Sequence, residues 1–195
     1  MTYGDRMLTM TTLRTGTAVA VVALALGAAR PAAAAGSYER WPAPSDASAS
    51  ARRAGLPMLT AEGTVMHHHA HLDVRVGGRA VTVPAGIGID EARRRVSPLH
   101  THDTTGVVHI ESPVRRTFRL GQFFAEWNVA LSRTRLGGLR TGARHTLGVY
   151  VNGRRATGDP AAIPLRQHDE IAVVYGRRGG PKPRVPVSYR FAPGL

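Results

Sequence analysis

The histidines of this sequence are concentrated in one region. The chain has 195 residues and nine histidines, and seven of the nine lie between positions 67 and 109. Neutral imidazole is a common ligand of transition metals, so clustered histidines can build a metal site. Residues two apart in an extended strand face the same side. The first histidine segment therefore places four potential ligands on one face: His67, His69, His71 and Asp73.

A second group of histidines lies further along the chain. His100 and His102 alternate in the same way, and a turn then leads into an extended segment in which His109 and Glu111 share a face. If these segments pair in a sheet, three or four histidines meet, with a carboxylate as a further ligand or as an orienting partner. Imidazole and carboxylate donors without thiolate suit Zn(II) or Cu(II), and also Ni(II) or Fe(II). The candidate ligands are His67, His69, His71, His100, His102, Asp103, His109 and Glu111.

A structural role for the histidines is the alternative interpretation. Residues 66–69 resemble part of an affinity tag, and an isolated His-Thr-His is often a hydrogen-bonded turn. A surface tract of this kind does not explain the alternation of His71 and Asp73, nor the second group. We expect His145 and His168, which stand alone, to be ordinary surface or turn residues.

The elements that position the histidines follow from the surrounding pattern. Residues 70–76 and 79–83 alternate on either side of Gly77-Gly78, which predicts a β-hairpin. Residues 106–111 predict another short strand, and a helix is expected over residues 118–128 with Thr117 as its N-cap. Its apolar face is formed by Leu120, Phe123, Phe124 and Trp127.

The order of the remaining elements indicates the fold class. Strands are expected at residues 146–151, 154–157 and 170–175, with a tight turn at Asn152-Gly153. A hairpin, one main helix and further strands on a mixed sheet predict an α+β, β-grasp-like (ubiquitin-like) fold. The extra strand near residues 106–112 departs from the simplest version of that fold.

The sequence also predicts four segments. Residues 1–35 have the pattern of a signal peptide, with Arg6 and Arg14 before an apolar run at 18–29 and cleavage near Ala35. An uncleaved anchor is the alternative. Residues 36–60 predict a flexible linker, residues 61–176 a folded domain and residues 177–195 a Pro- and Arg-rich tail. The protein is therefore expected to be secreted or extracytoplasmic.

Charge and cysteine content limit the partners. The chain carries 26 Lys and Arg against 13 Asp and Glu, a formal net charge of +13. This charge favours an anionic cell-wall polymer or a membrane surface. Nucleic acid is not expected as a partner, because an exported chain seldom meets it. The absence of cysteine excludes disulfides and a lipid anchor through Cys.

Several of these motifs together resemble a family of exported bacterial and archaeal proteins without an established activity. The matching stretches carry HxHxHL, VPAGIG, LHTHDxxGxxHxESP and LGQFFxxW, at residues 67–72, 83–88, 99–113 and 120–127. The resemblance implies that the histidines and Glu111 belong to one pattern, which does not include His68. Related proteins often carry a Cys just before the LHTH stretch, where this chain has residues 95–98 instead.

Three classes of function remain open. The favoured one is an exported cell-envelope protein that binds a divalent transition metal and is not an enzyme. The others are a metal-dependent hydrolase, with Glu111 or Asp103 as general base, and a binding module for a cell-wall polymer or protein partner. The sequence has no nucleophile elbow, phosphate-binding loop or dinucleotide fingerprint.

Overall fold

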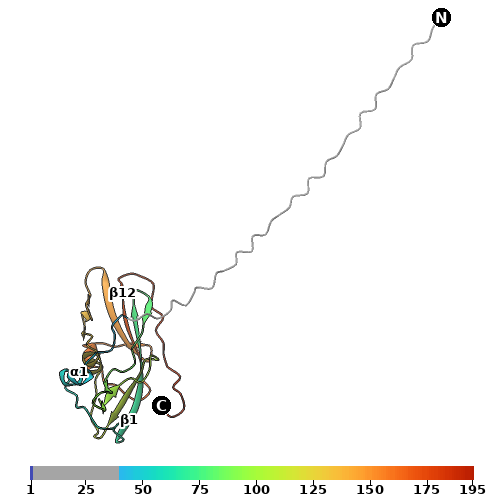
Figure 1. Cartoon of the computed structure of the whole chain (residues 1–195). Helices are drawn as coiled ribbons and strands as arrows, with labels where there is room; N and C mark the ends of the chain where they lie inside the picture. Colours follow the sequence, from blue (N-terminus) through green and yellow to red (C-terminus); the bar gives the residue numbers. More distant parts are fainter. Residues whose placement is uncertain (2–39) are drawn as a thin grey trace. The chain divides into compact units, whose positions relative to one another are not determined.

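A computed structural model describes Met1 and residues 40–195 of the chain (Figure 1). The predicted signal peptide and the first residues of the predicted linker lie outside these residues. The helical elements are α1 (Ala47–Arg53), α2 (Leu120–Glu126) and the 3₁₀ turn η1 (Pro160–Ala162). The strands are β1 (Met66–Val76), β2 (Arg79–Val81), β3 (Ile89–Asp90), β4 (Arg95–Val96), β5 (Leu99–His100), β6 (Val107–Ser112), β7 (Leu131–Ser132), β8 (Arg135–Leu136), β9 (Leu139–Arg140), β10 (His145–Val151), β11 (Arg154–Arg155) and β12 (Glu170–Arg177). Among the described helices, none has the length and apolarity needed to cross a membrane.

The fold is α+β, and its main sheet is mixed. The strand order is β11-β10-β12-β1-β6-β5, and β2 also pairs with β1. Only β1 and β12 run parallel, whereas β1 is antiparallel to both β2 and β6. The predicted hairpin over β1 and β2 is confirmed, and so is the pairing of the two histidine-bearing strands β1 and β6.

The two faces of the main sheet differ in chemistry. One face carries the apolar residues of β1, β6 and β12, which are Ala70, Leu72, Val74, Val108, Ile110, Ile171 and Val173. These residues are buried in one hydrophobic core. Because side chains alternate along a strand, the intervening residues of β1 and β6 place the histidines on the opposite face. The predicted opposition of His109 and Glu111 to Val108 and Ile110 is therefore confirmed.

Helix α2 contributes the aromatic part of the core. Phe123, Phe124 and Trp127 are almost completely buried, as their helical spacing predicts. The helix begins later than expected, at Leu120, and its N-cap is Arg119 rather than Thr117. The Gln122 side chain accepts a hydrogen bond of 3.1 Å from the Arg119 backbone N–H, so the helix starts where this local contact forms.

The prediction of a flexible linker over residues 36–60 is wrong for the part that the structure describes. Helix α1 lies there, and the Asp46 side chain caps it by accepting a hydrogen bond from the Ala49 N–H. Ala51 is buried in the core. The Trp127 indole N–H donates to the Trp41 carbonyl at 3.0 Å, and the two rings meet edge to face. A segment rich in Ser, Ala and Pro is thus ordered by tertiary contacts.

The predicted tail also contacts the domain. Strand β12 extends to Arg177, beyond the expected end of the domain at residue 176. Further on, the Tyr189 ring stacks on His71 with 3.7 Å between ring centroids, and Phe191 stacks on His168. The C-terminal segment therefore runs along the domain.

Candidate metal centre

Strand register brings the histidines together. Across the sheet, His69 of β1 is directly opposite His109 of β6, and His109 is directly opposite His100 of β5. Two residues away on each strand, and on the same face, His67 of β1 is directly opposite Glu111 of β6. These residues form a contiguous polar patch because directly paired side chains on one face lie about 5 Å apart. The ring centroid of His109 lies 4.6 Å from that of His69 and 5.1 Å from that of His100.

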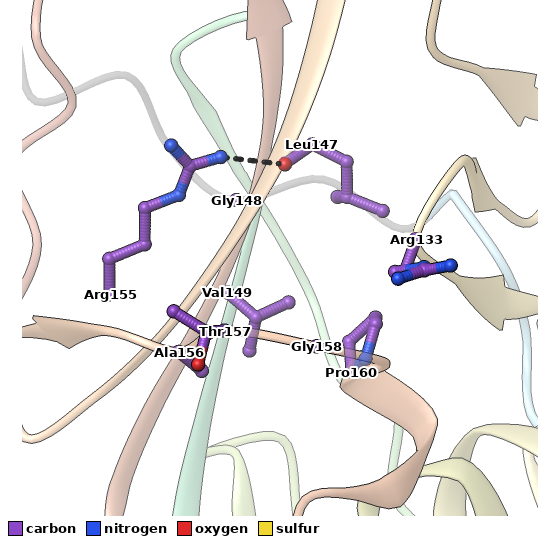
Figure 2. A pocket seen from close by; sticks show the side chains of 9 residues that line it. All are labelled: Arg133, Leu147, Gly148, Val149, Arg155, Ala156, Thr157, Gly158 and Pro160. Atoms are coloured by element: carbon purple, nitrogen blue, oxygen red, sulfur yellow. Dashed lines mark hydrogen bonds between the residues drawn. The ribbon is translucent and has the colours of Figure 1, made fainter.

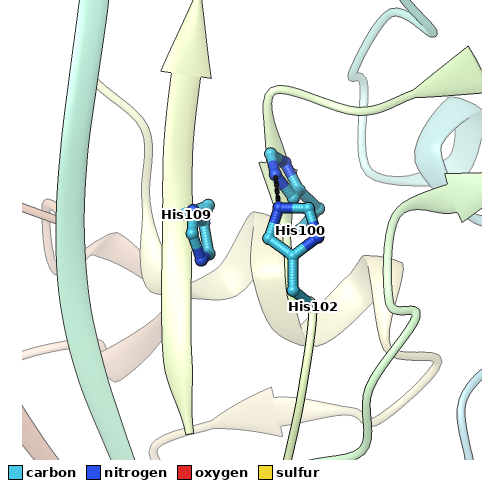
Figure 3. Close-up of side chains that lie close together, drawn as sticks. All are labelled: His100, His102 and His109. Atoms are coloured by element: carbon cyan, nitrogen blue, oxygen red, sulfur yellow. Dashed lines mark hydrogen bonds between the residues drawn. The ribbon is translucent and has the colours of Figure 1, made fainter. Parts of the chain in front are cut away.

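The first candidate site is the three-histidine group, which consists of His100, His102 and His109 (Figure 3). Each residue offers one ring nitrogen, and the three nitrogens lie within 4.8 Å of one another. The Nε2 atoms of His100 and His102 are 3.2 Å apart. Two ligand atoms bound at about 2.0–2.1 Å to a tetrahedral zinc ion are roughly 3.3 Å apart. The spacing of this histidine pair therefore fits one edge of such a site.

The backbone fixes the tautomer of His100. Its Nδ1 lies 2.9 Å from the carbonyl oxygen of Ser97. A carbonyl oxygen only accepts, so Nδ1 carries the proton, and in the neutral ring Nε2 presents its lone pair to His102. Metal-binding histidines usually donate their other ring N–H to a carbonyl or carboxylate in this way. His109 has a matching arrangement, since its Nδ1 lies 3.0 Å from Oε1 of Glu111.

The second candidate site is the Glu111 group, which consists of His67, His69 and Glu111. The Oε1 atom of Glu111 lies 3.6 Å from Nε2 of His67 and 3.7 Å from Nε2 of His69. His69 and Glu111 are almost completely buried, while His67 is half-exposed. Within the described part of the chain, neither ring nitrogen of His69 has a hydrogen-bond partner, nor does Oε2 of Glu111. Such unsatisfied buried atoms are suited to bind a cation.

Burial and charge keep the ligand atoms in the form that binds metal. Burial lowers the pKa of His69 to about 4, and repulsion from His109 and His67 acts in the same direction. Burial also lowers the pKa of His100 to about 4, although Glu111 opposes the shift. For Glu111, burial would raise the pKa, but the hydrogen bond from His109 and the surrounding histidines lower it to about 2. The two buried imidazoles are thus neutral and the carboxylate ionised at pH 7.

His71 lies apart from these two groups, although it was predicted to join them. It belongs to a separate group with Asp73 and Glu170. Its Nδ1 lies 2.7 Å from Oε2 of Glu170, and its Nε2 lies 2.9 Å from the carbonyl oxygen of Thr105. Both partners accept, so both ring nitrogens donate and His71 is an imidazolium. Burial would lower the pKa of His71, but the bond to Glu170 and the contact with Thr105 outweigh it and raise that pKa.

Of the two predicted carboxylate ligands, only Glu111 belongs to a candidate metal group with the histidines. The Asp103 carboxylate instead accepts hydrogen bonds from the backbone N–H and the hydroxyl of Thr105, and the hydroxyl bond lowers its pKa. Sequence reasoning missed Glu62, which lies 3.3 Å from Nε2 of His102 and 3.7 Å from Nε2 of His100. An antiparallel bridge between Leu59 and Val96 brings this loop to the site. The sequence signal that could have identified Glu62 as a ligand is its position a few residues before His67.

The remaining polar features lie elsewhere. A cavity of about 410 Å³ is lined by nine residues of the region around β10 and β11, including Arg133 and Arg155, and none of them is a potential metal ligand (Figure 2). A second cavity of about 550 Å³ is lined by residues that include His68, Arg116 and Arg166, but by none of the three-histidine or Glu111 groups. His145 stacks on the Tyr175 ring.

Comparison with models of known families, with curated proteins and with solved structures finds no match for this chain. What the protein does must therefore be inferred from the site itself. Its buried histidine and glutamate groups can hold a metal ion.

Proposed function

We propose that this protein binds a divalent transition metal, Zn(II) or Cu(II), through its clustered histidines and is not an enzyme. The observation that carries the proposal is the three-histidine group. The Ser97 carbonyl fixes the Nε2 lone pair of His100 at 3.2 Å from Nε2 of His102, and His109 adds a third nitrogen from the neighbouring strand. Three imidazoles without thiolate suit these two metals.

The surroundings of the histidines favour binding over catalysis. His102 and Glu62 are about half-exposed, so an ion can enter from solvent. The two cavities described above are lined by residues outside the three-histidine and Glu111 groups. Glu62 would act as a fourth ligand or as an acceptor for a ligand N–H.

A chelator-competition titration tests the proposal. We expect the chain, purified without a histidine tag, to bind Zn(II) or Cu(II), and the double variant His100→Ala/His102→Ala to bind at least roughly 100-fold more weakly, because it loses two direct ligands. His145→Ala is the matched control and should bind like wild type, since His145 stacks on Tyr175 outside the site. Equal affinity in the double variant, or affinity no greater than that of a generic histidine-rich peptide, would contradict the proposal.

We also propose that the protein is exported and cleaved near Ala35, and that it belongs to the exported family which its motifs resemble. The apolar run at residues 18–29 and the small residues before position 36 support export. Mass spectrometry of the protein from culture medium or cell envelope should find a chain beginning near Gly36. A full-length chain in the cytoplasm would contradict export.

The strand order supports a β-grasp assignment as a further part of this proposal. Around the parallel central pair of β1 and β12, the order β2-β1-β12-β10-β11 has one antiparallel hairpin on each side. This is the arrangement expected of a ubiquitin-like sheet. In this interpretation, β5 and β6 are additional strands, and they carry His100 and His109 of the proposed site.

Binding of an anionic cell-wall polymer is a second candidate function. The cavity of about 550 Å³ is lined by Arg116, Arg119 and Arg166, whose charges suit phosphate or carboxylate groups. Co-sedimentation with purified cell walls should decrease at high salt and in the triple variant in which these arginines become Gln. Sedimentation that is unchanged in the variant would contradict it.

A further inference from the structure

We propose that the centre binds two metal ions, with Glu111 as the carboxylate that links them. The inference rests on the proposed metal-binding function and adds a second ion in the Glu111 group. The three-histidine group would hold one ion and His67, His69 and Glu111 the other. The two groups share no residue, and each brings its ligand atoms within 4.8 Å of one another.

The two carboxylate oxygens of Glu111 face opposite sides of the histidine patch. Its Oε1 atom faces the β1 side, 3.6 Å from Nε2 of His67 and 3.7 Å from Nε2 of His69. Its Oε2 atom faces the other side, 3.9 Å from Nε2 of His100. Oε1 thus faces His67 and His69 and also accepts from Nδ1 of His109, whereas Oε2 faces His100. A carboxylate placed in this way can bridge two ions, and two-metal sites hold their ions about 3.5–4 Å apart.

The burial of His69 without hydrogen-bond partners also points to a second ion. Its side chain is only 1 % exposed, yet neither ring nitrogen has a hydrogen-bond partner among the described residues. An unsatisfied buried polar group costs about 1–3 kcal/mol. An ion bound at Nε2, beside Oε1 of Glu111, would satisfy one of the two nitrogens. The three-histidine group alone leaves His69 unexplained.

A single ion cannot use all of these ligand atoms. Two atoms bound to one zinc ion at about 2.0–2.1 Å are at most roughly 4.2 Å apart. Among the residues that the structure describes, His67 and His69 occur in no candidate group with His100, His102 or His109. His109 of the three-histidine group connects the two groups, because its Nδ1 lies 3.0 Å from Oε1 of Glu111.

Metal stoichiometry tests the inference. The full chain, loaded with excess Zn(II) and passed through a desalting column, should contain two ions per chain by elemental analysis. The double variant His67→Ala/His69→Leu should retain one. His68→Ala is the matched control, because His68 lies on the same strand but on the opposite face, and it should retain two. If the double variant does not fold, His67→Ala alone should still lower the affinity for the second ion at least roughly tenfold, since His67 is half-exposed.

The outcomes separate this inference from the proposed function. One ion in wild type that is unaffected by His67→Ala but lost in His100→Ala/His102→Ala overturns the second site and leaves metal binding intact. No bound ion in wild type overturns both. Two ions in both wild type and the His67→Ala/His69→Leu variant overturn the assignment to the Glu111 group. With Cu(II), the two-ion form should show a spin-coupled electron paramagnetic resonance spectrum, and two independent mononuclear signals would overturn the bridge.

Discussion

His69 and His71 are two residues apart on β1 and face the same side of the sheet, but their environments are opposite. His69 is neutral, and its ring nitrogens have no hydrogen-bond partner among the described residues. His71 donates from both nitrogens, to Glu170 and to the Thr105 carbonyl. The difference arises from the strands beside them, because His69 is opposite His109 on β6 whereas His71 is opposite Glu170 on β12.

This comparison teaches that alternation identifies a face but not the chemistry of each position on it. A histidine beside other histidines is kept neutral and available to a metal. His71, which is hydrogen-bonded to the buried Glu170, becomes its cation, whereas His69 stays neutral although Glu111 lies 3.7 Å away. Substitutions at the two positions should therefore have different effects on stability.

The largest effect is expected from His71→Leu. Removing the imidazolium leaves the Glu170 carboxylate buried without its cation, which should lower the free energy of unfolding by about 3–5 kcal/mol. Chemical denaturation at pH 6 measures the change. Because the pKa of His71 is raised in the folded state, the ion pair stabilises the fold fully below about pH 6.5, the pKa of an unfolded histidine. This stabilisation is lost as the pH rises through the pKa of His71 in the folded protein. A loss below 1 kcal/mol at pH 6 would refute the ion pair.

Glu126 is a buried carboxyl group that contrasts with Glu170, because neither of its oxygens has a hydrogen-bond partner among the described residues. Burial raises the pKa of Glu126 to about 8, and Ser97 opposes only part of the shift. The folded state then holds a proton that the unfolded state loses above about pH 4.5, so stability falls as the pH rises from 4.5 to 8. Glu126→Gln should therefore gain stability relative to wild type over this range, by up to roughly 3 kcal/mol. Denaturation curves at pH 5 and pH 8 check this, and a constant difference would argue against it.

A much smaller effect is expected from His69→Leu, the partner substitution to His71→Leu. It removes two unsatisfied buried nitrogens and nearly conserves volume, so the metal-free protein should unfold within about 1 kcal/mol of wild type or be slightly more stable. The measurement is chemical denaturation in the presence of a chelator. A loss as large as that of His71→Leu would show that the two histidines do not differ.

The smallest effect is expected from Tyr189→Ala. This ring stacks on His71 at a centroid distance of 3.7 Å, and a contact between an aromatic ring and a cation contributes about 0.5–2 kcal/mol. The loss should occur in the wild-type background but not when His71→Leu is already present, and a double-mutant cycle measures this non-additivity. Equal losses in both backgrounds would mean that the stacking contributes nothing.

The parts of the fold that sequence could predict are those with local periodicity. The hairpin of β1 and β2 and the shared face of His109 and Glu111 follow from alternation. Helix α1 was missed because its Ser- and Ala-rich sequence has little apolar pattern, although Asp46 is a typical N-cap. The position of Glu62 at the site and the pairing of His71 with Glu170 depend on which segments lie beside these residues. Tertiary structure determines this, and local sequence patterns do not show it.

Diffraction from crystals of the Zn(II)-loaded protein, measured at the zinc absorption edge, tests whether the three-histidine group binds metal. Anomalous scattering locates each ion without reference to any assumed site. We expect a peak among the ring nitrogens of His100, His102 and His109, and none beside His71, where both nitrogens are already bonded. A peak between His71, Asp73 and Glu170, with none at the three-histidine group, would contradict it.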